Sequence, residues 1–207
     1  FEFADAVIGV DKFGMSGNGD DVYKEYGFDV DKIISEYKPE VVFHCAAWTN
    51  VDGAEENKEM CYKVNVEGTN NITNACRNVN AKLIYISTDY VFSGEKEGLY
   101  ETTDEVNPKN VYGESKVESE EIVRNYDKSF IVRTSWVFGI NGKNFIKTML
   151  RLAETNKEVN VVGDQVGSPT YTVDLAKLLI DMSQTEKYGT YHANNSGYCS
   201  WAEFAKY

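Results

Sequence analysis

Tyr112 and Lys116 are the two residues of this sequence whose types and spacing most directly suggest chemistry. A spacing of four places both side chains on one face of a helix, one turn apart. An unperturbed tyrosine phenol has a pKa of about 10 and is a weak acid at neutral pH. A nearby ammonium favours the phenolate and typically lowers such a pKa by about 1–3. The pair predicts a tyrosine that exchanges a proton with a reacting oxygen, although the spacing alone also fits an ordinary surface helix.

Short apolar segments alternate with helical patterns along the chain, and this order predicts the fold. The segments expected to form strands are 6–10, 40–46, 82–87, 130–134, 159–162 and 190–193. The helical patterns cover 30–37, 58–78, a stretch around Tyr112, 145–154, 172–183 and 201–207. Continuous apolar strands between helices are typical of parallel strands covered on both faces. The sequence therefore predicts an α/β fold with a doubly wound, Rossmann-like parallel sheet.

The charge of the chain restricts its partners. Among 207 residues, Lys and Arg number 21 and Asp and Glu 33, which gives a net charge of −12. This acidity argues against nucleic acid or an anionic membrane surface as a partner. The acidic residues of the helix at 114–121 are expected to form a solvated face.

The cysteines and histidines give no sign of a metal site. Four cysteines without a zinc-binding spacing and two histidines are present, so we expect no metal ligation. We find no signal peptide and no apolar stretch long enough to span a bilayer, and we therefore expect a cytoplasmic protein.

In doubly wound sheets, ligands bind beyond the carboxyl ends of the strands. Asp11 ends the first expected strand, where an acid either hydrogen-bonds the ribose of a dinucleotide or caps a turn. The second strand ends in Ala46 and Ala47, whose small side chains allow a flat cofactor to lie close to the backbone. Thr88 and Asp89 place a hydroxyl beside an acid at the end of the third strand. We therefore expect the reaction at this edge of the sheet.

Five stretches of the sequence occur in the same order in one family of reductases. They are HCAAWTNVD (44–52), STDYVF (87–92), VYGESK (111–116), RTSWVF (133–138) and GDQVGSPT (163–170). On these stretches the chain resembles the dTDP-4-dehydrorhamnose reductases, which are extended short-chain dehydrogenases/reductases. The Tyr-x-x-x-Lys spacing is specific only to the superfamily, whereas the STDYVF and RTSW stretches are specific to this branch.

The resemblance implies NAD(P)H-dependent reduction of the C4 keto group of dTDP-4-dehydro-L-rhamnose to dTDP-L-rhamnose. Tyr112 would donate a proton to the C4 oxygen, with Lys116 and Thr88 assisting it. The implied contacts with the dTDP-sugar are Thr88, Asp89 and Trp136. The implied contacts with NADH or NADPH are Asp11, Phe28, Ala46, Ala47, Trp48, Thr49, Ile86, Tyr112 and Lys116.

The resemblance also implies a division of the chain. Residues 1–139, completed by 171–194, would form the dinucleotide-binding domain, and 140–170 with 195–207 would form parts of a substrate-binding lobe. A dinucleotide fold has a glycine-rich turn about 20 residues before its ribose-binding acid, and Asp11 leaves no room for it. We therefore expect that the first βα unit is missing and that the lobe is incomplete. The resemblance is compatible with a homodimer.

Cofactor preference and the reaction itself stay open on the sequence alone. Asp11 favours NADH, while the neighbouring Lys12 could accept the 2′-phosphate of NADPH. One alternative is a non-catalytic NAD(P)-binding protein similar to the regulatory subunit of methionine adenosyltransferase. Another is a reductase or epimerase of a different nucleotide sugar.

Overall fold

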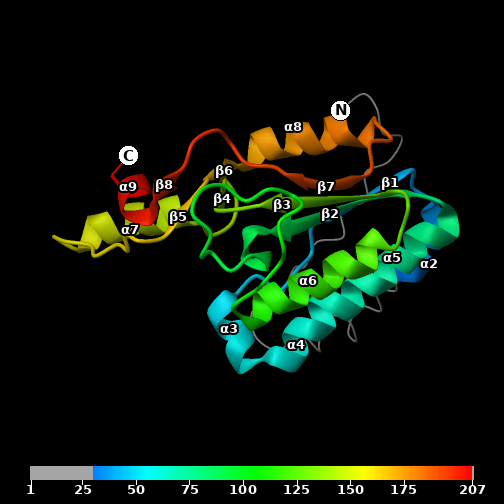
Figure 1. The fold of residues 1–207 in the computed structure, drawn as a ribbon, viewed down its shortest axis with the longest axis horizontal. Helices are drawn as coiled ribbons and strands as arrows, with labels where there is room; N and C mark the ends of the chain where they lie inside the picture. Colours follow the sequence, from blue (N-terminus) through cyan, green and yellow to red (C-terminus); the bar gives the residue numbers. More distant parts are fainter. Residues whose placement is uncertain (1–29, 207) are drawn as a thin grey trace.

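Among the residues that the structure describes, a four-stranded parallel sheet forms the centre (Figure 1). The computed structural model describes residues 30–206. The strands lie in the order β1 (Val41–His44), β2 (Lys82–Thr88), β3 (Ser129–Thr134) and β7 (Gly189–His192). Each neighbouring pair in this sheet is parallel. The expected strand at 6–10 lies outside the described residues.

Helices cover both faces of the sheet. Helices α2 (Val30–Tyr37), α5 (Gly68–Val79) and α6 (Val111–Arg124) lie on one side in Figure 1, and α8 (Thr172–Ser183) lies on the other. Parallel strands with helices on both faces constitute a doubly wound architecture. The predicted α/β fold is therefore confirmed.

Alternate residues of the strands enter two separate hydrophobic cores. Leu83 and Tyr85 pack in the core beneath α2, α5 and α6. Ile84 and Phe130 pack in the core beneath α8, together with Leu179 of that helix. This alternation follows from the two-residue period of a strand. It explains why the strands read as continuous apolar segments in the sequence.

The helix expected at 58–78 consists of three consecutive segments. They are α4 (Lys58–Tyr62), a π-helical segment η1 (Lys63–Glu67) and α5. A π-helical turn is rare and is often found at functional sites. Asn80 ends the run in the left-handed conformation, with φ of 62°. A short preceding helix, α3 (Val51–Glu56), was not predicted.

Short elements build the C-terminal part of the chain. Two helices and two small pairs of strands form it: α7 (Phe145–Thr155), α9 (Trp201–Phe204), parallel β4 (Val137–Phe138) and β6 (Thr170–Tyr171), and antiparallel β5 (Val166–Gly167) and β8 (Cys199–Ser200). In Figure 1 this part extends to one side of the central sheet. The predicted division into two domains stays a prediction.

The predicted strand at 159–162 is wrong. Val159 and Val162 are 38% and 52% exposed, and the segment is irregular. The Val162 carbonyl accepts a 2.9 Å hydrogen bond from the backbone N–H of Ala202 in α9. A short apolar run does not by itself determine secondary structure.

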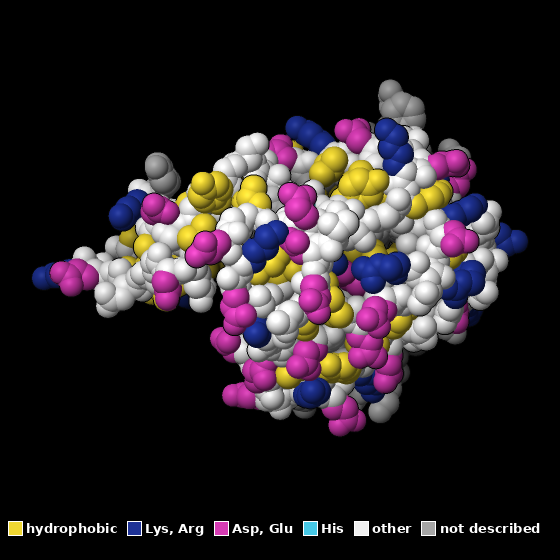
Figure 2. All heavy atoms as spheres, in the orientation of Figure 1, with side chains coloured by type: hydrophobic (Ala, Val, Ile, Leu, Met, Phe, Trp, Pro, Cys, Tyr) yellow, Lys and Arg dark blue, Asp and Glu magenta, His cyan; other side chains and the backbone are white. Residues whose placement is uncertain are grey.

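Acidic side chains are spread over the face of the molecule shown in Figure 2, with lysines and arginines between them. This distribution agrees with the net charge of −12 and gives no continuous basic surface on that face. Within residues 30–206, none of the helices has both the length and the hydropathy needed to cross a bilayer.

Candidate active site

The start of α6 places Tyr112 at the edge of the sheet. The Asn110 side chain caps this helix by accepting a 2.7 Å hydrogen bond from the Gly113 backbone N–H. Gly113 permits close packing, because a Cβ there would lie 2.4 Å from the carbonyl oxygen of Tyr90. Tyr90 belongs to η2 (Asp89–Val91), a 3₁₀ turn that directly follows β2. The helix thus begins beside the end of β2. The absence of a side chain at Gly113 permits this close approach, which sequence reasoning missed.

Tyr112 is buried, and its phenol lies next to the Thr88 side chain. Burial raises the pKa of Tyr112 to about 12, while the Thr88 hydroxyl lowers it and the charge of Asp89 raises it by smaller amounts that this value includes. Our prediction of a lowered pKa for Tyr112 is therefore wrong for this structure, because burial determines the net shift. The phenol keeps its proton at neutral pH, which is the state that a proton donor requires.

Lys116 lies one turn further along α6 and is 2% exposed. Its Nζ donates a 2.8 Å hydrogen bond to the carbonyl oxygen of Ile86 and lies 4.1 Å from the centroid of the Tyr85 ring. Burial lowers the pKa of Lys116 to about 7, and the charge of Glu120 acts in the opposite direction. The amine is thus directed toward the backbone of β2 and makes its hydrogen bond there.

Thr88 and Asp89 lie where β2 passes into η2. The Thr88 hydroxyl donates a 3.1 Å hydrogen bond to the Asp89 carboxyl group and accepts one of 3.2 Å from the Tyr90 backbone N–H. Burial raises the pKa of Asp89 to about 6, against a smaller lowering by Thr88. The structure therefore brings Thr88, Asp89, Tyr112 and Lys116 together at the carboxyl end of β2, as the sequence predicted.

The segment after β1 contains four of the predicted cofactor contacts. Ala46 and Thr49 are exposed, and Ala47 and Trp48 are half-buried. A buried residue of the π-helical segment, Asn65, holds this segment in place. Its side chain accepts a 2.7 Å hydrogen bond from the Trp48 backbone N–H and donates one of 3.2 Å to the Trp48 carbonyl. Sequence reasoning missed Asn65, because this residue lies within a regular helical pattern and no motif distinguishes it.

Trp136, a predicted sugar contact, has an unusual backbone conformation. Its φ is 48°, a region that a bulky residue rarely adopts. Its indole stacks on Trp201 with centroids 3.5 Å apart and an interplanar angle of 11°. Gly167 leaves room for the indole, since a Cβ there would lie 2.5 Å from the ring. The ring position is thus fixed by the C-terminal elements, and its contact with a sugar stays a prediction.

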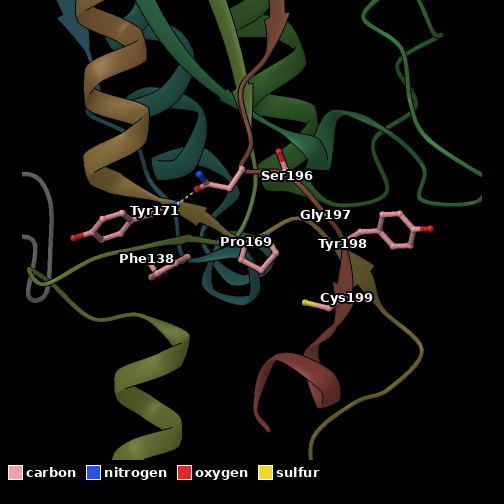
Figure 3. Close-up of a pocket in the computed structure, with 8 residues that line it drawn as sticks. Phe138, Pro169, Tyr171, Ser196, Gly197, Tyr198 and Cys199 are labelled. Carbon is pink, nitrogen blue, oxygen red and sulfur yellow. Dashed lines mark hydrogen bonds between the residues drawn. The ribbon is translucent and has the colours of Figure 1, made fainter. Parts of the chain in front are cut away.

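A hollow of about 530 Å³ lies between the C-terminal elements (Figure 3). The residues that line it are Phe138, Pro169, Tyr171, Asn195, Ser196, Gly197, Tyr198 and Cys199. None of these was predicted as a site residue. The catalytic assignment therefore rests on the residues at the end of β2 and not on this hollow.

Two of the predicted cofactor contacts, Asp11 and Phe28, lie outside the described residues. The remaining expectations about the dinucleotide ribose accordingly stay predictions.

Comparisons with known proteins identify relatives across most of the chain. The family described as RmlD substrate binding domain matches residues 21–207. A dTDP-4-dehydrorhamnose reductase of Aggregatibacter actinomycetemcomitans is 44% identical over 183 residues, covering 85% of this chain and 62% of the relative. A spore coat polysaccharide biosynthesis protein of Bacillus subtilis is 46% identical over 170 residues, covering 82% of this chain and 60% of the relative.

A solved structure has the same fold. It is that of a dTDP-4-dehydrorhamnose reductase from Bacillus anthracis in complex with NADP. The TM-score is 0.84 and the identity 47%, over 86% of this chain and 64% of that one. This chain thus spans less than two thirds of the length of each of these relatives.

Proposed function

The chain belongs to the dTDP-4-dehydrorhamnose reductase family, and on this premise we propose that the whole protein reduces the C4 keto group of dTDP-4-dehydro-L-rhamnose to dTDP-L-rhamnose with NADH or NADPH. The observation that supports this proposal most directly is the buried Tyr112 phenol next to Thr88 and one helix turn from Lys116. Reduction of a ketone needs a source of hydride, a source of a proton and a hydrogen bond to the developing alkoxide.

Three side chains of the described site match the second and third of these needs. Tyr112 holds a proton at neutral pH, since burial raises its pKa to about 12, and would transfer that proton from Oη to the C4 oxygen. Thr88, whose hydroxyl lies next to the Tyr112 phenol, would orient this oxygen. Lys116, when protonated, would stabilise the phenolate left behind, because opposite charges at short range attract strongly in a site of low dielectric constant. Solvent would then return a proton to Tyr112.

The residues present fit a nicotinamide dinucleotide. The small side chains of Ala46 and Ala47 leave the backbone beyond β1 open to a flat ligand, and the Thr49 hydroxyl and the Lys116 ammonium are donors suited to ribose hydroxyls. The Asn65 side chain fixes the backbone of this segment through its two hydrogen bonds with Trp48. NADH or NADPH held here would supply the hydride.

The test is a reductase assay with the full-length protein. We expect loss of the absorbance of reduced nicotinamide when dTDP-4-dehydro-L-rhamnose is added, and formation of dTDP-L-rhamnose. The control is dTDP-glucose, which has no keto group at C4. No cofactor oxidation with either NADH or NADPH would reject the proposal and favour the non-catalytic alternative. Faster turnover of another 4-keto nucleotide sugar would assign a different substrate to the same chemistry.

A further inference from the structure

Glu120, one helix turn after Lys116 on α6, is 1% exposed and its carboxylate is fully engaged. Its Oε1 accepts hydrogen bonds from Ser87 Oγ at 2.6 Å and from Arg133 Nε at 2.9 Å. Its Oε2 accepts from Arg133 Nη2 at 2.6 Å and from the half-exposed Arg124 Nη2 at 3.4 Å. The sequence placed this acid on a solvated helix face, and that prediction is wrong, because a bidentate arginine and a serine compensate its burial.

The two partners of Glu120 lie side by side on neighbouring strands. Ser87 of β2 and Arg133 of β3 are paired in the register of the sheet. Arg133 is itself enclosed: its guanidinium lies 4.9 Å from the centroid of the Phe92 ring, and its Nη1 donates a 3.4 Å hydrogen bond to the Thr102 carbonyl. The Glu120 carboxylate thus joins α6 to β2 and to β3 at one register position of the sheet.

This junction is directly adjacent to the proposed catalytic residues. Lys116 binds the carbonyl of Ile86, and Glu120 binds the side chain of the next residue, Ser87. The residue after Ser87 is Thr88, whose side chain lies next to the Tyr112 phenol and acts on its pKa. Three successive turns of α6, at Tyr112, Lys116 and Glu120, therefore contact the last three residues of β2.

We propose that Glu120 is a positioning residue for the reaction: its ion pair with Arg133 and its hydrogen bond from Ser87 hold α6 against β2 so that Tyr112 stays in contact with Thr88. This inference rests on the proposed function. Misplacement of a catalytic group by about 1 Å can reduce a rate about 10²-fold, so a fixed helix position matters for the chemistry.

The charge of Glu120 adds a second effect that can be measured. It raises the pKa of Lys116 against the larger lowering by burial. Removal of this charge should therefore make Lys116 lose its proton at lower pH. The other titratable groups near Lys116, which must be intact in this comparison, are His44, Cys45, Cys61, Tyr85 and Tyr112.

The experiment compares Glu120→Gln, Arg133→Met, the double variant and Glu121→Gln in the full-length protein. Glu121 is the exposed neighbour on the same helix and is the matched control. We expect Glu120→Gln to lower kcat about 10- to 100-fold with small changes in KM, and to move the alkaline limb of the kcat/KM profile to lower pH. Arg133→Met should lower kcat without that shift, because the charge of Glu120 remains.

The double variant separates positioning from simple stability. Removing both charges eliminates the unpaired buried guanidinium that Glu120→Gln leaves behind, so we expect the Tm of the double variant to exceed that of Glu120→Gln. Its kcat should stay low and its alkaline limb should stay shifted. If Glu120→Gln and the double variant keep the wild-type kcat and pH profile and change only Tm, Glu120 is merely structural and the proposal is overturned.

A measurement without turnover distinguishes failure of this proposal from failure of the proposed function. With 13C-labelled tyrosine, the NMR resonance of Tyr112 is assigned by its loss in Tyr112→Phe. We expect this resonance to move in Glu120→Gln and not in Glu121→Gln. An inactive wild type with a displaced resonance would reject the reductase assignment and retain the positioning role. A resonance that stays in place would reject the positioning role, whatever the activity.

Discussion

The amine of Lys116 donates its 2.8 Å hydrogen bond to the backbone carbonyl of Ile86, the residue that precedes the Ser87-Thr88 end of β2. The lysine is therefore anchored to the strand and not to the phenol of Tyr112. Its influence on the reaction is best understood as that of a buried charge close to the site. Such an influence depends on the protonation state of the amine, and hence on pH.

The pH dependence of the reaction follows from this buried amine. Burial lowers the pKa of Lys116 to about 7, so the ammonium is fully present below that pH and is lost above it. Because kcat/KM reports the free enzyme, we expect it to fall above about pH 7, by as much as about tenfold per pH unit. Lys116→Arg, which stays charged, should remove the alkaline limb, while Lys116→Met should lower the rate at every pH. A wild-type profile that is flat from neutral to alkaline pH contradicts this assignment.

Removal of one hydroxyl tests the proton donor. Tyr112→Phe should lower kcat about 10²- to 10⁴-fold, because the C4 oxygen loses its acid, while NADPH affinity changes little. Tyr62→Phe is the matched control. Tyr62 lies in α4, and its hydroxyl donates a hydrogen bond to Glu114 of α6 and not to the groups at the end of β2. Steady-state kinetics and cofactor titration by fluorescence measure both effects. Equal rates for Tyr112→Phe and the wild type would show that the proton comes from another group.

The sequence predicted those features that depend on local pattern. The bounds of α2 and α8 agree with the structure, since Pro39 follows closely after α2 and Asp174 lies in the first turn of α8. The π-helical segment could not be predicted, because the spacing of buried residues hardly changes across it. The ion pair of Glu120 with Arg133 was also missed, since pairing of a helix with a strand depends on the tertiary structure and not on spacing along the chain. The pKa of Tyr112 was misjudged for the same reason, because burial is invisible in a motif.

A buried imidazole makes the fold sensitive to acid. His44 Nε2 hydrogen-bonds with the Thr69 hydroxyl at 2.9 Å, while Nδ1 is buried without a hydrogen-bond partner among the described residues. Burial, with a smaller contribution from the charge of Lys116, lowers the pKa of His44 from 6.5 to about 3. Between these two pH values the unfolded chain binds a proton that the native state excludes. This part of the stability is therefore complete above pH 6.5 and is lost as the pH falls toward 3.

The measurement for His44 is the free energy of unfolding as a function of pH. The imidazole should contribute a slope of up to about 1.4 kcal/mol per pH unit in that range. His44→Gln should reduce the slope, whereas the same change at the exposed His192 should retain it. Carboxyl groups also make the free energy of unfolding fall at acid pH in the wild type and in both variants. The diagnostic quantity is therefore the difference in slope between each variant and the wild type. Identical slopes for His44→Gln and the wild type would exclude the imidazole as a source of acid sensitivity.

The contact between Gly167 and Trp136 provides a test of sugar binding. A Cβ on residue 167 would lie 2.5 Å from the indole, so Gly167→Ala must displace the ring or the loop. Overpacking of this kind typically costs about 1–3 kcal/mol of stability. We expect KM for the dTDP-sugar to rise about tenfold through the displaced indole, an effect worth about 1.4 kcal/mol in binding. NADPH affinity should be unchanged, because the cofactor segment beyond β1 does not involve this contact.

The matched control for Gly167→Ala is Gly163→Ala, shortly before β5. Among the described residues, a Cβ at Gly163 would meet only the Ala202 Cβ within 4 Å, at an ordinary van der Waals distance of 3.7 Å. This variant should therefore keep the wild-type KM and Tm. If Gly167→Ala lowers Tm but leaves KM for the sugar nucleotide unchanged, Trp136 serves to pack the C-terminal elements through Trp201 and does not contact the substrate. If both quantities change only in Gly167→Ala, the position of the indole determines sugar affinity, and its strained φ of 48° is retained for that role.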